Sequence, residues 1–184
     1  MIISIERFRL PRYDEIPDVG LYLDQTVKYI NRYLEPLGCI EITASMVSNY
    51  VKKGYISSPV KKQYDAEQIA RLFFITVAKR VISMENITRM FAMQRACYDN
   101  ATAYDYFCAE MENMLLYTFA LKSSPDVIGS TETEAKKMLR SVILAVTQII
   151  YLNCRLELMP YEAQEAADGD DEEAIEESIE EAIE

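Results

Sequence analysis

The chain has 184 residues, half of them apolar, and a formal net charge of −11 at pH 7. This length suits one domain of ordinary size, or a small domain with a helical extension. The absence of histidine excludes Ser-His-Asp and Cys-His catalytic systems and the common zinc-ligand patterns. The five scattered glycines form neither a dinucleotide-binding nor a phosphate-binding loop. The sequence therefore favours a protein that is not an enzyme and carries no metal or other cofactor.

The N-terminus and the most apolar segment both indicate a cytoplasmic protein without membrane contact. Residues 1–7 contain an acid and a base where a signal peptide would need a longer apolar region. The apolar run from Val142 to Leu152 is far shorter than the roughly 20 residues that span a bilayer. We expect this run to belong to a buried or partner-facing helix.

Residues 1–95 are expected to form an extended arm and then four helices. The arm covers residues 1–19, where prolines interrupt any long helix. Helical spacing and capping residues place helices from Tyr22 to Leu34, from Thr43 or Ser45 to Gly54, from Asp65 to about Arg80, and from Ser83 through Phe91. The third helix opens with a capping box in which Gln68 is the partner of its N-cap. Residues 55–64 carry proline and lysines without a helical period, which indicates a loop or small wing.

Residues 96–160 are expected to supply two longer helices for packing or dimerisation. The first runs from about Thr102 to Leu121. The second opens with a capping box of Thr131 and Glu134 and runs to about Leu158. It carries a wider apolar surface than one flanking helix covers, which predicts a homodimer. With no repeat and no strand longer than a few residues, the predicted fold class is all-α.

Aromatic residues gather on and near the first of these two helices. They could line a small-molecule pocket, but packing in a helical core or a dimer is the favoured interpretation, because aromatics commonly fill such positions. The residues are Tyr98, Tyr104, Tyr106, Phe107, Tyr117 and Phe119.

The negative charge is concentrated at the end of the chain. Residues 161–184 contain twelve acids and no base, so residues 1–160 have a net charge of +1. Between Glu41 and Asp65 lie four lysines and no acid. The overall charge therefore describes the tail, and the local charge permits contact with DNA.

The acidic tail, residues 161–184, is expected to be disordered around Asp168–Asp171, because like charges repel and little apolar surface is present. Further on, Ile175, Ile179 and Ile183 recur every four residues among glutamates, as a narrow stripe on a potential helix. Two interpretations stay open. The tail is a solubilising segment, or it is an internal DNA mimic that lies over the four lysines and competes with phosphate.

The helix that ends before Gly54 has the features of a recognition helix. Val47, Tyr50 and Val51 share a packing side. The opposite side is short, polar and uncharged except for one lysine, so it suits close approach to the major groove and contact with adenine and guanine edges. The predicted DNA base contacts are Ser45, Ser48, Asn49 and Lys52.

This region resembles the winged helix-turn-helix of MerR-type regulators over about residues 42–91. The signature at the end of that family's recognition helix is matched by Tyr50, Lys52, Gly54, Ile56 and Pro59. Tyr64-Asp65 resembles the tyrosine before the family's third helix, and the runs Glu67–Ile75 and Ser83–Ile87 resemble its next two helices. The resemblance implies a MerR-like DNA-binding unit with a small wing, which we place at residues 20–95.

Basic residues around the recognition helix complete the predicted DNA surface. The predicted phosphate contacts are Tyr50, Lys53, Lys61 and Lys62. Two positions depart from the MerR pattern, because Ser48 and Lys62 stand where that family has arginines.

A longer stretch resembles an uncharacterised bacterial family, domain of unknown function 1836. The residues that carry this resemblance are Leu10–Asp18, Gly20–Gln25 and Ser45–Gly54, and it extends over about residues 8–155. It implies kinship and no particular activity.

The leading hypothesis is a transcription regulator that binds double-stranded DNA through residues 20–95 and dimerises through its last two helices. The alternative is a protein-interaction adaptor that has the helix-turn-helix shape but no DNA affinity. The uncharged Ser48 and the acidic tail motivate this alternative.

Overall fold

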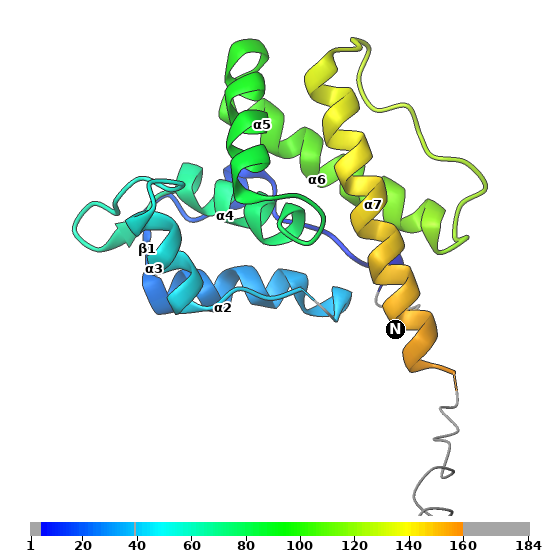
Figure 1. Cartoon of the computed structure of the whole chain (residues 1–184), viewed down its shortest axis with the longest axis horizontal. Helices are drawn as coiled ribbons and strands as arrows, with labels where there is room; N and C mark the ends of the chain where they lie inside the picture. The colour runs from blue at the N-terminus through cyan, green and yellow to red at the C-terminus, as the bar shows by residue number, and fades with distance from the viewer. Residues whose placement is uncertain (1–4, 39, 160–184) are drawn as a thin grey trace, which may run out of the picture.

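The structure, a computed structural model, describes residues 5–38 and 40–159. Six helices lie wholly within these residues (Figure 1). They are α2 (Leu23–Leu34), α3 (Ala44–Lys52), α4 (Ala66–Ala78), α5 (Met84–Cys97), α6 (Asn100–Thr118) and α7 (Glu134–Glu157). Two short 3-10 helices, η1 (Tyr13–Glu15) and η2 (Glu35–Leu37), accompany them. The predicted mostly helical fold is confirmed, and the acidic tail lies outside the described residues.

The predicted capping residues open the helices of the first half. The Thr43 side chain accepts a hydrogen bond from the Met46 amide at 3.2 Å and so caps α3. At α4, Asp65 accepts from the Gln68 amide at 2.8 Å while the Gln68 side chain accepts from the Asp65 amide at 2.9 Å. Ser83 caps α5. The capping box at the start of α4 is therefore confirmed, and these caps satisfy amides that have no partner within the helix.

Both long helices begin at residues other than those predicted. Asp99 caps α6 by accepting from the Thr102 amide at 2.8 Å, which brings Thr102 inside the helix. Thr133, not Thr131, caps α7 through the Lys136 amide. The predicted capping box of Thr131 and Glu134 is therefore wrong, because Glu134 is the first residue of α7 and is too close to the cap.

A small antiparallel sheet supplements the helices. Strand β1 (Leu21–Tyr22) pairs with β2 (Gln63–Tyr64), so the segment before α2 lies beside the loop that leads into α4. Gly20 precedes β1 with a φ of 74°, and a β-carbon added there would lie 3.1 Å from the Gln63 β-carbon. Glycine therefore suits both the backbone conformation and the close approach of the strands. The all-α class is correct apart from this sheet.

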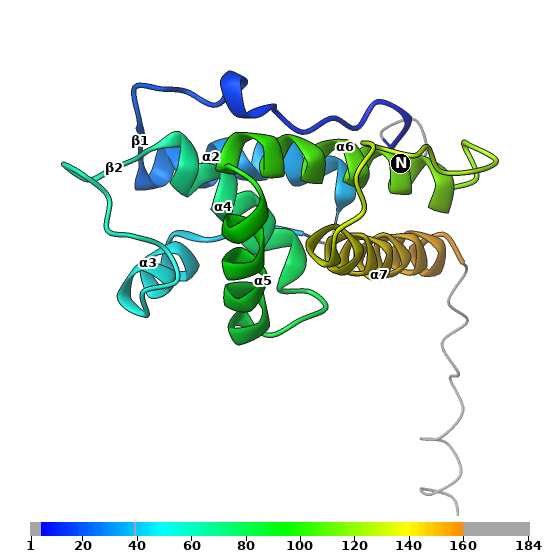
Figure 2. The ribbon, with the colours of Figure 1, turned by 90° about the horizontal axis from the view of Figure 1, so that it is seen from above.

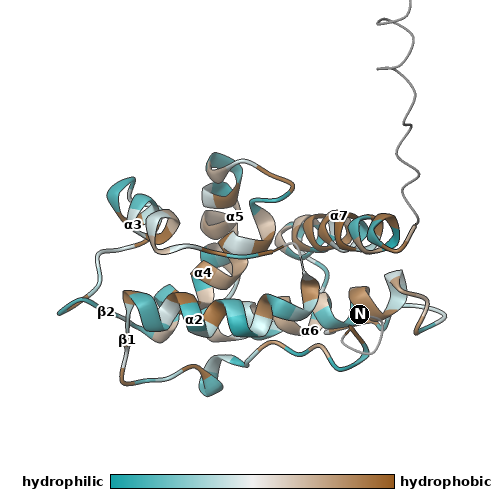
Figure 3. Cartoon of the chain, turned by 90° about the horizontal axis from the view of Figure 1, so that it is seen from below, coloured by the Kyte–Doolittle hydropathy of each residue, from teal (hydrophilic) through white to brown (hydrophobic). Residues whose placement is uncertain are grey.

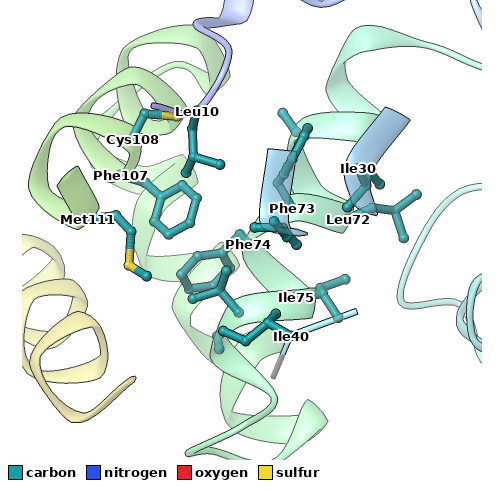
Figure 4. Close-up of a cluster of buried hydrophobic side chains, with 14 of the residues drawn as sticks. Leu10, Ile30, Ile40, Leu72, Phe73, Phe74, Ile75, Phe107, Cys108 and Met111 are labelled. Carbon is teal, nitrogen blue, oxygen red and sulfur yellow. The ribbon is translucent and has the colours of Figure 1, made fainter. Parts of the chain in front are cut away.

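Helix α4 is the centre of the core. Ten of its thirteen residues are buried, as expected of a helix that is apolar on nearly every side. Phe73 contacts Tyr29 and Tyr33 of α2, whereas Phe74 packs edge-on against Phe107 of α6 with centroids 5.4 Å apart (Figure 4). The same core continues to Val142, Ile143, Val146 and Ile150 of α7.

The N-terminal segment lies along α6 (Figure 2). Ile5, Leu10 and Ile16 are buried there. The Arg12 guanidinium donates to both carboxylate oxygens of Glu112 on α6, at 2.7 and 2.6 Å. This two-pronged ion pair is the strong arrangement of arginine with a carboxylate, so it ties residues 5–19 to the helical body.

Helix α7 exposes large apolar side chains on one side. One side packs on α6, while Met138, Leu152 and Leu156 on the other side are 44, 55 and 64 % exposed. By length and composition alone, α7 is also the helix of the described residues that could cross a membrane. Core helices of soluble proteins meet the same criterion, and Arg140 of α7 is paired with Glu110 and Glu132.

Candidate nucleic-acid interface

Helix α3 presents one buried and one exposed side. Val47 and Tyr50 lie in the core, where Tyr50 is 7 % exposed. The four predicted base-contacting side chains all lie at the surface: Ser45, Ser48, Asn49 and Lys52. Helix α3 stands at the end of the molecule away from α7, with hydrophilic residues on its outer side (Figure 3). The structure thus brings the four predicted side chains to one open face.

The start of α3 is fixed by its neighbours in space. The side-chain amide of Asn31 on α2 donates to the Ile42 carbonyl at 2.8 Å and accepts from the Ile42 amide at 2.9 Å. The Lys79 ammonium, just after α4, lies 3.1 Å from the Met46 sulfur and 3.5 Å from the Glu41 carbonyl oxygen. Because Asn31 of α2 holds the chain just before α3 and Lys79 contacts Met46 in its first turn, α3 has a defined orientation on the body.

Tyr50 differs from the other predicted contact residues. Its ring packs edge-on against Tyr55, with centroids 6.5 Å apart, and burial raises the pKa of its hydroxyl. Its backbone carbonyl accepts from the Tyr55 amide at 2.9 Å, where the chain leaves the helix. The position of Tyr50 therefore favours a role in supporting α3 over the predicted phosphate contact.

The segment between α3 and β2, residues 55–62, forms a projecting loop that we call the wing. Its base is anchored by the side chain of Gln68, which donates to the carbonyl of Ser57 at 2.8 Å and lies 3.0 Å from the hydroxyl of the same serine. Near its tip, Val60 and Gln63 form an antiparallel bridge, and the Gln63 amide donates to the Val60 carbonyl at 2.9 Å. The tip is thus a two-residue hairpin turn.

The two central residues of this turn are Lys61 and Lys62, with φ of 50° and 66°. Both φ angles are those of a type I′ turn, in which asparagine and glycine are the favoured residues. A non-glycine residue in the left-handed region costs roughly 1–2 kcal/mol. Two exposed lysines therefore occupy turn positions where asparagine and glycine would have a lower backbone energy. Backbone strain of this kind is typical of functional sites.

The lysines of this surface are free of ion pairs with the described residues. Lys52, Lys53, Lys61 and Lys62 are all exposed. The ion pairs within 4.0 Å in the described residues involve other cations. Their charge is therefore available to an anionic partner such as a phosphate backbone.

The chain matches a known family model. Residues 11–107 match the model of a family described as Domain of unknown function (DUF1836). This range is more than half of the chain. The chain belongs to the DUF1836 family. The predicted kinship is thus confirmed, over a shorter range than expected: the DUF1836 match begins at Pro11 and ends within α6, so it includes α2 to α5 but not α7. No curated protein and no solved structure matched the chain.

Proposed function

We propose that this protein is a cytoplasmic transcription regulator that binds double-stranded DNA through a MerR-like winged helix-turn-helix. In this proposal α2 and α3 are the two helices of the motif, and α3 is the recognition helix. The observation that carries the proposal is the open polar face of α3 beside a wing whose tip holds Lys61 and Lys62 in the left-handed conformation. A surface of this kind combines groups that read bases with groups that neutralise phosphates.

The chemistry of α3 suits the major groove. The groove is about 12 Å wide, which admits an α-helix, whose diameter with its side chains is about 10–12 Å. Ser45 and Ser48 are small, so they permit close approach of the helix axis to the bases. Asn49 has the amide that pairs with both hydrogen-bonding groups of adenine, and Lys52 has a donor for guanine. The wing lysines would contact the phosphates beside the groove.

We propose further that the protein acts as a homodimer through α7. The outer side carries exposed or half-buried apolar residues at spacings of seven, four, three, four and three: Met138, Ala145, Ile149, Leu152 and Leu156 of α7, and Met159 just after it. This is the heptad spacing of a coiled-coil seam. Because α3 and α7 lie at opposite ends of the protomer (Figure 2), such pairing leaves both recognition helices free for a two-fold operator.

Fluorescence anisotropy with a labelled random-sequence duplex tests the DNA proposal. Three lysines per protomer, Lys53, Lys61 and Lys62, contact phosphates in this proposal, so log affinity should fall against log salt with a slope of roughly −3 per protomer. Lys61→Gln should reduce the slope by about 0.9. Lys137→Gln is the matched control, because Lys137 is an exposed lysine on α7. A flat salt response, or equal slopes for both variants, contradicts the proposal.

The recognition face is tested separately with a duplex selected for tight binding. Asn49→Ala should weaken that duplex by about 1–3 kcal/mol and leave random-sequence binding unchanged, because a lost base contact affects only the sequence that it reads. Lys61→Gln should weaken both duplexes alike. If the two variants have the same pattern, α3 does not read bases.

The alternative function is a protein-interaction adaptor without DNA affinity. Ser48 favours it, since an exposed, uncharged side chain stands where MerR-type regulators have an arginine. The adaptor predicts no salt-dependent binding to any duplex, so the anisotropy experiment distinguishes the two functions.

A further inference from the structure

A cavity of about 360 Å³ lies between α4, α5, α6, the start of α7 and the loop at Gly129–Thr131. Four of the six aromatic residues singled out in the sequence line it: Tyr98, Tyr104, Tyr106 and Phe107. Phe74 and Phe91 add further aromatic surface from α4 and α5. The favoured interpretation of this aromatic group, core or dimer packing, is therefore incomplete. A cavity of this size, with apolar walls and few polar groups, has the usual character of a small-molecule site.

Two cations from different helices also line this cavity. On α4, the Arg71 guanidinium lies 5.1 Å from the centroid of the Phe91 ring and pairs with Glu67 at 3.1 Å. Its Nε atom is buried and has no hydrogen-bond partner among the described residues. A buried donor without an acceptor costs free energy, so a ligand that supplies an acceptor for Nε would be stabilised here.

The second cation is Lys136, near the start of α7. Only 8 % of Lys136 is exposed, and no described carboxylate lies within 4.0 Å of its ammonium group. Nζ donates to the Thr131 carbonyl at 2.9 Å and lies 4.7 and 5.8 Å from the ring centroids of Tyr106 and Tyr98. These aromatic faces stabilise the charge in part. Glu110 of α6 interacts electrostatically with Lys136, but its ion pair is with Arg140, so the buried ammonium has no ion pair of its own among the described residues.

The loop before α7 lies close to the Lys136 ammonium. Gly129 has a φ of 77°, and a β-carbon added there would lie 2.8 Å from Nζ. The loop therefore passes close to the lysine with a backbone conformation that suits glycine, and a side chain at this position would displace the ammonium. The loop, the aromatic rings and the ammonium are all part of the cavity lining.

We propose that this cavity binds a small planar, apolar molecule that carries one negative charge, such as an aromatic carboxylate. The apolar and aromatic walls provide the surface for the ring system. The two cations and the single carboxylate of Glu67 give the lining a net charge of +1, which a monoanion neutralises. A carboxylate also supplies the acceptor that Arg71 Nε lacks, whereas a dianion such as a phosphate monoester would leave charge uncompensated.

Titration of the full-length protein with 1-naphthoate, followed by naphthalene fluorescence, tests this proposal. The chain contains no tryptophan, so the ligand signal is free of tryptophan emission. We expect saturable binding of one molecule per chain. Lys136→Met should weaken it by about tenfold or more, the effect of losing a hydrogen bond to a charged group. Lys137→Met, the change of the next, exposed lysine, should leave it unaltered.

Two further pairs of measurements make the result specific. The neutral analogue 1-naphthalenemethanol should bind wild type and Lys136→Met with similar affinity, because it lacks the charge that the lysine recognises. Arg71→Gln should weaken naphthoate binding, whereas Arg89→Gln is the matched control, since Arg89 forms the same i,i+4 ion pair with Glu85 on an exposed surface. The arginine pair decides the matter if Lys136→Met does not fold.

Ala103, which lines the cavity on α6, offers a steric test. Ala103→Phe should abolish binding of both naphthalene compounds while circular dichroism shows that the helices remain. Absence of saturable naphthoate binding to wild type overturns the proposal. Equal naphthoate binding by Lys136→Met and Lys137→Met, together with equal binding by Arg71→Gln and Arg89→Gln, overturns it as well. None of these assays contains DNA, so they are independent of the proposed regulator function.

Discussion

Replacing the two lysines at the tip of the wing by the residues that the turn prefers should make the protein more stable and a weaker DNA binder. The double variant is Lys61→Asn with Lys62→Gly. Each lysine has a left-handed φ, at a cost of roughly 1–2 kcal/mol, which glycine does not incur and asparagine tolerates better. Glycine adds freedom to the unfolded chain, which offsets about 0.4–1 kcal/mol of the gain.

The expected net increase in the free energy of unfolding is about 1–3 kcal/mol. For a chain of this length, each kcal/mol corresponds to a rise of roughly 2–4 °C in the melting temperature. Thermal and urea unfolding followed by circular dichroism measure both quantities. The same variant should lower the salt slope of DNA binding by about 1.8, because it removes two phosphate contacts.

The control for this prediction is the double variant Lys61→Gln with Lys62→Gln, which removes the charges but keeps the unfavourable backbone. It should lower the salt slope equally without the gain in stability. An Asn-Gly variant that is no more stable than wild type would refute the argument from backbone strain. Unchanged DNA binding by both double variants would show that the lysines have another role.

Three further predictions follow from the described contacts. Leu152→Lys on α7 should convert a dimer to a monomer in sedimentation at micromolar concentration, since it places a charge in the proposed apolar seam; a monomeric wild type contradicts the seam. Arg12→Ala should lower the free energy of unfolding by about 1–3 kcal/mol, because it leaves the half-buried carboxylate of Glu112 without its partner. Arg9→Ala is the control: it removes an exposed ion pair and should cost less than about 1 kcal/mol. Burial raises the pKa of Cys108 to about 12, so at pH 8 iodoacetamide should label the exposed Cys97 well before Cys108, as read by peptide mass spectrometry.

Local sequence signals predicted the helices of the first half of the chain well. A capping residue at Thr43, Asp65 and Ser83 precedes an apolar period of 3.6 in each case, and the two signals agree. At α7 two threonines, Thr131 and Thr133, compete for the cap, and the motif alone does not show which one the loop brings into place. The two-residue strands are too short to have a period, so pairing of β1 with β2 had no detectable signal.

Of the site residues, too, some could be predicted from the sequence and others could not. The exposed face of α3 follows from helical spacing alone, because Val47 and Tyr50 mark the buried side. The turn at Lys61 and Lys62 was hidden, since it contains neither the glycine nor the asparagine that normally indicates a type I′ turn. Lys136 was also hidden: in the sequence it is one of two adjacent lysines, and only the approach of Thr131 and the tyrosine rings distinguishes it from its exposed neighbour.

The two proposed sites meet on α4. Gln68 of this helix holds the base of the wing through Ser57, and one turn further on Arg71 lines the cavity. A ligand that attracts Arg71 therefore acts on the element that anchors the wing. If ligand binding changes the DNA affinity by some factor, thermodynamic linkage requires that DNA binding change the ligand affinity by the same factor. Naphthoate titrations with and without a saturating duplex measure that factor. The variant Gln68→Ala should reduce this coupling factor towards one, because the substitution removes the hydrogen bonds between α4 and the wing while the cavity lining stays intact.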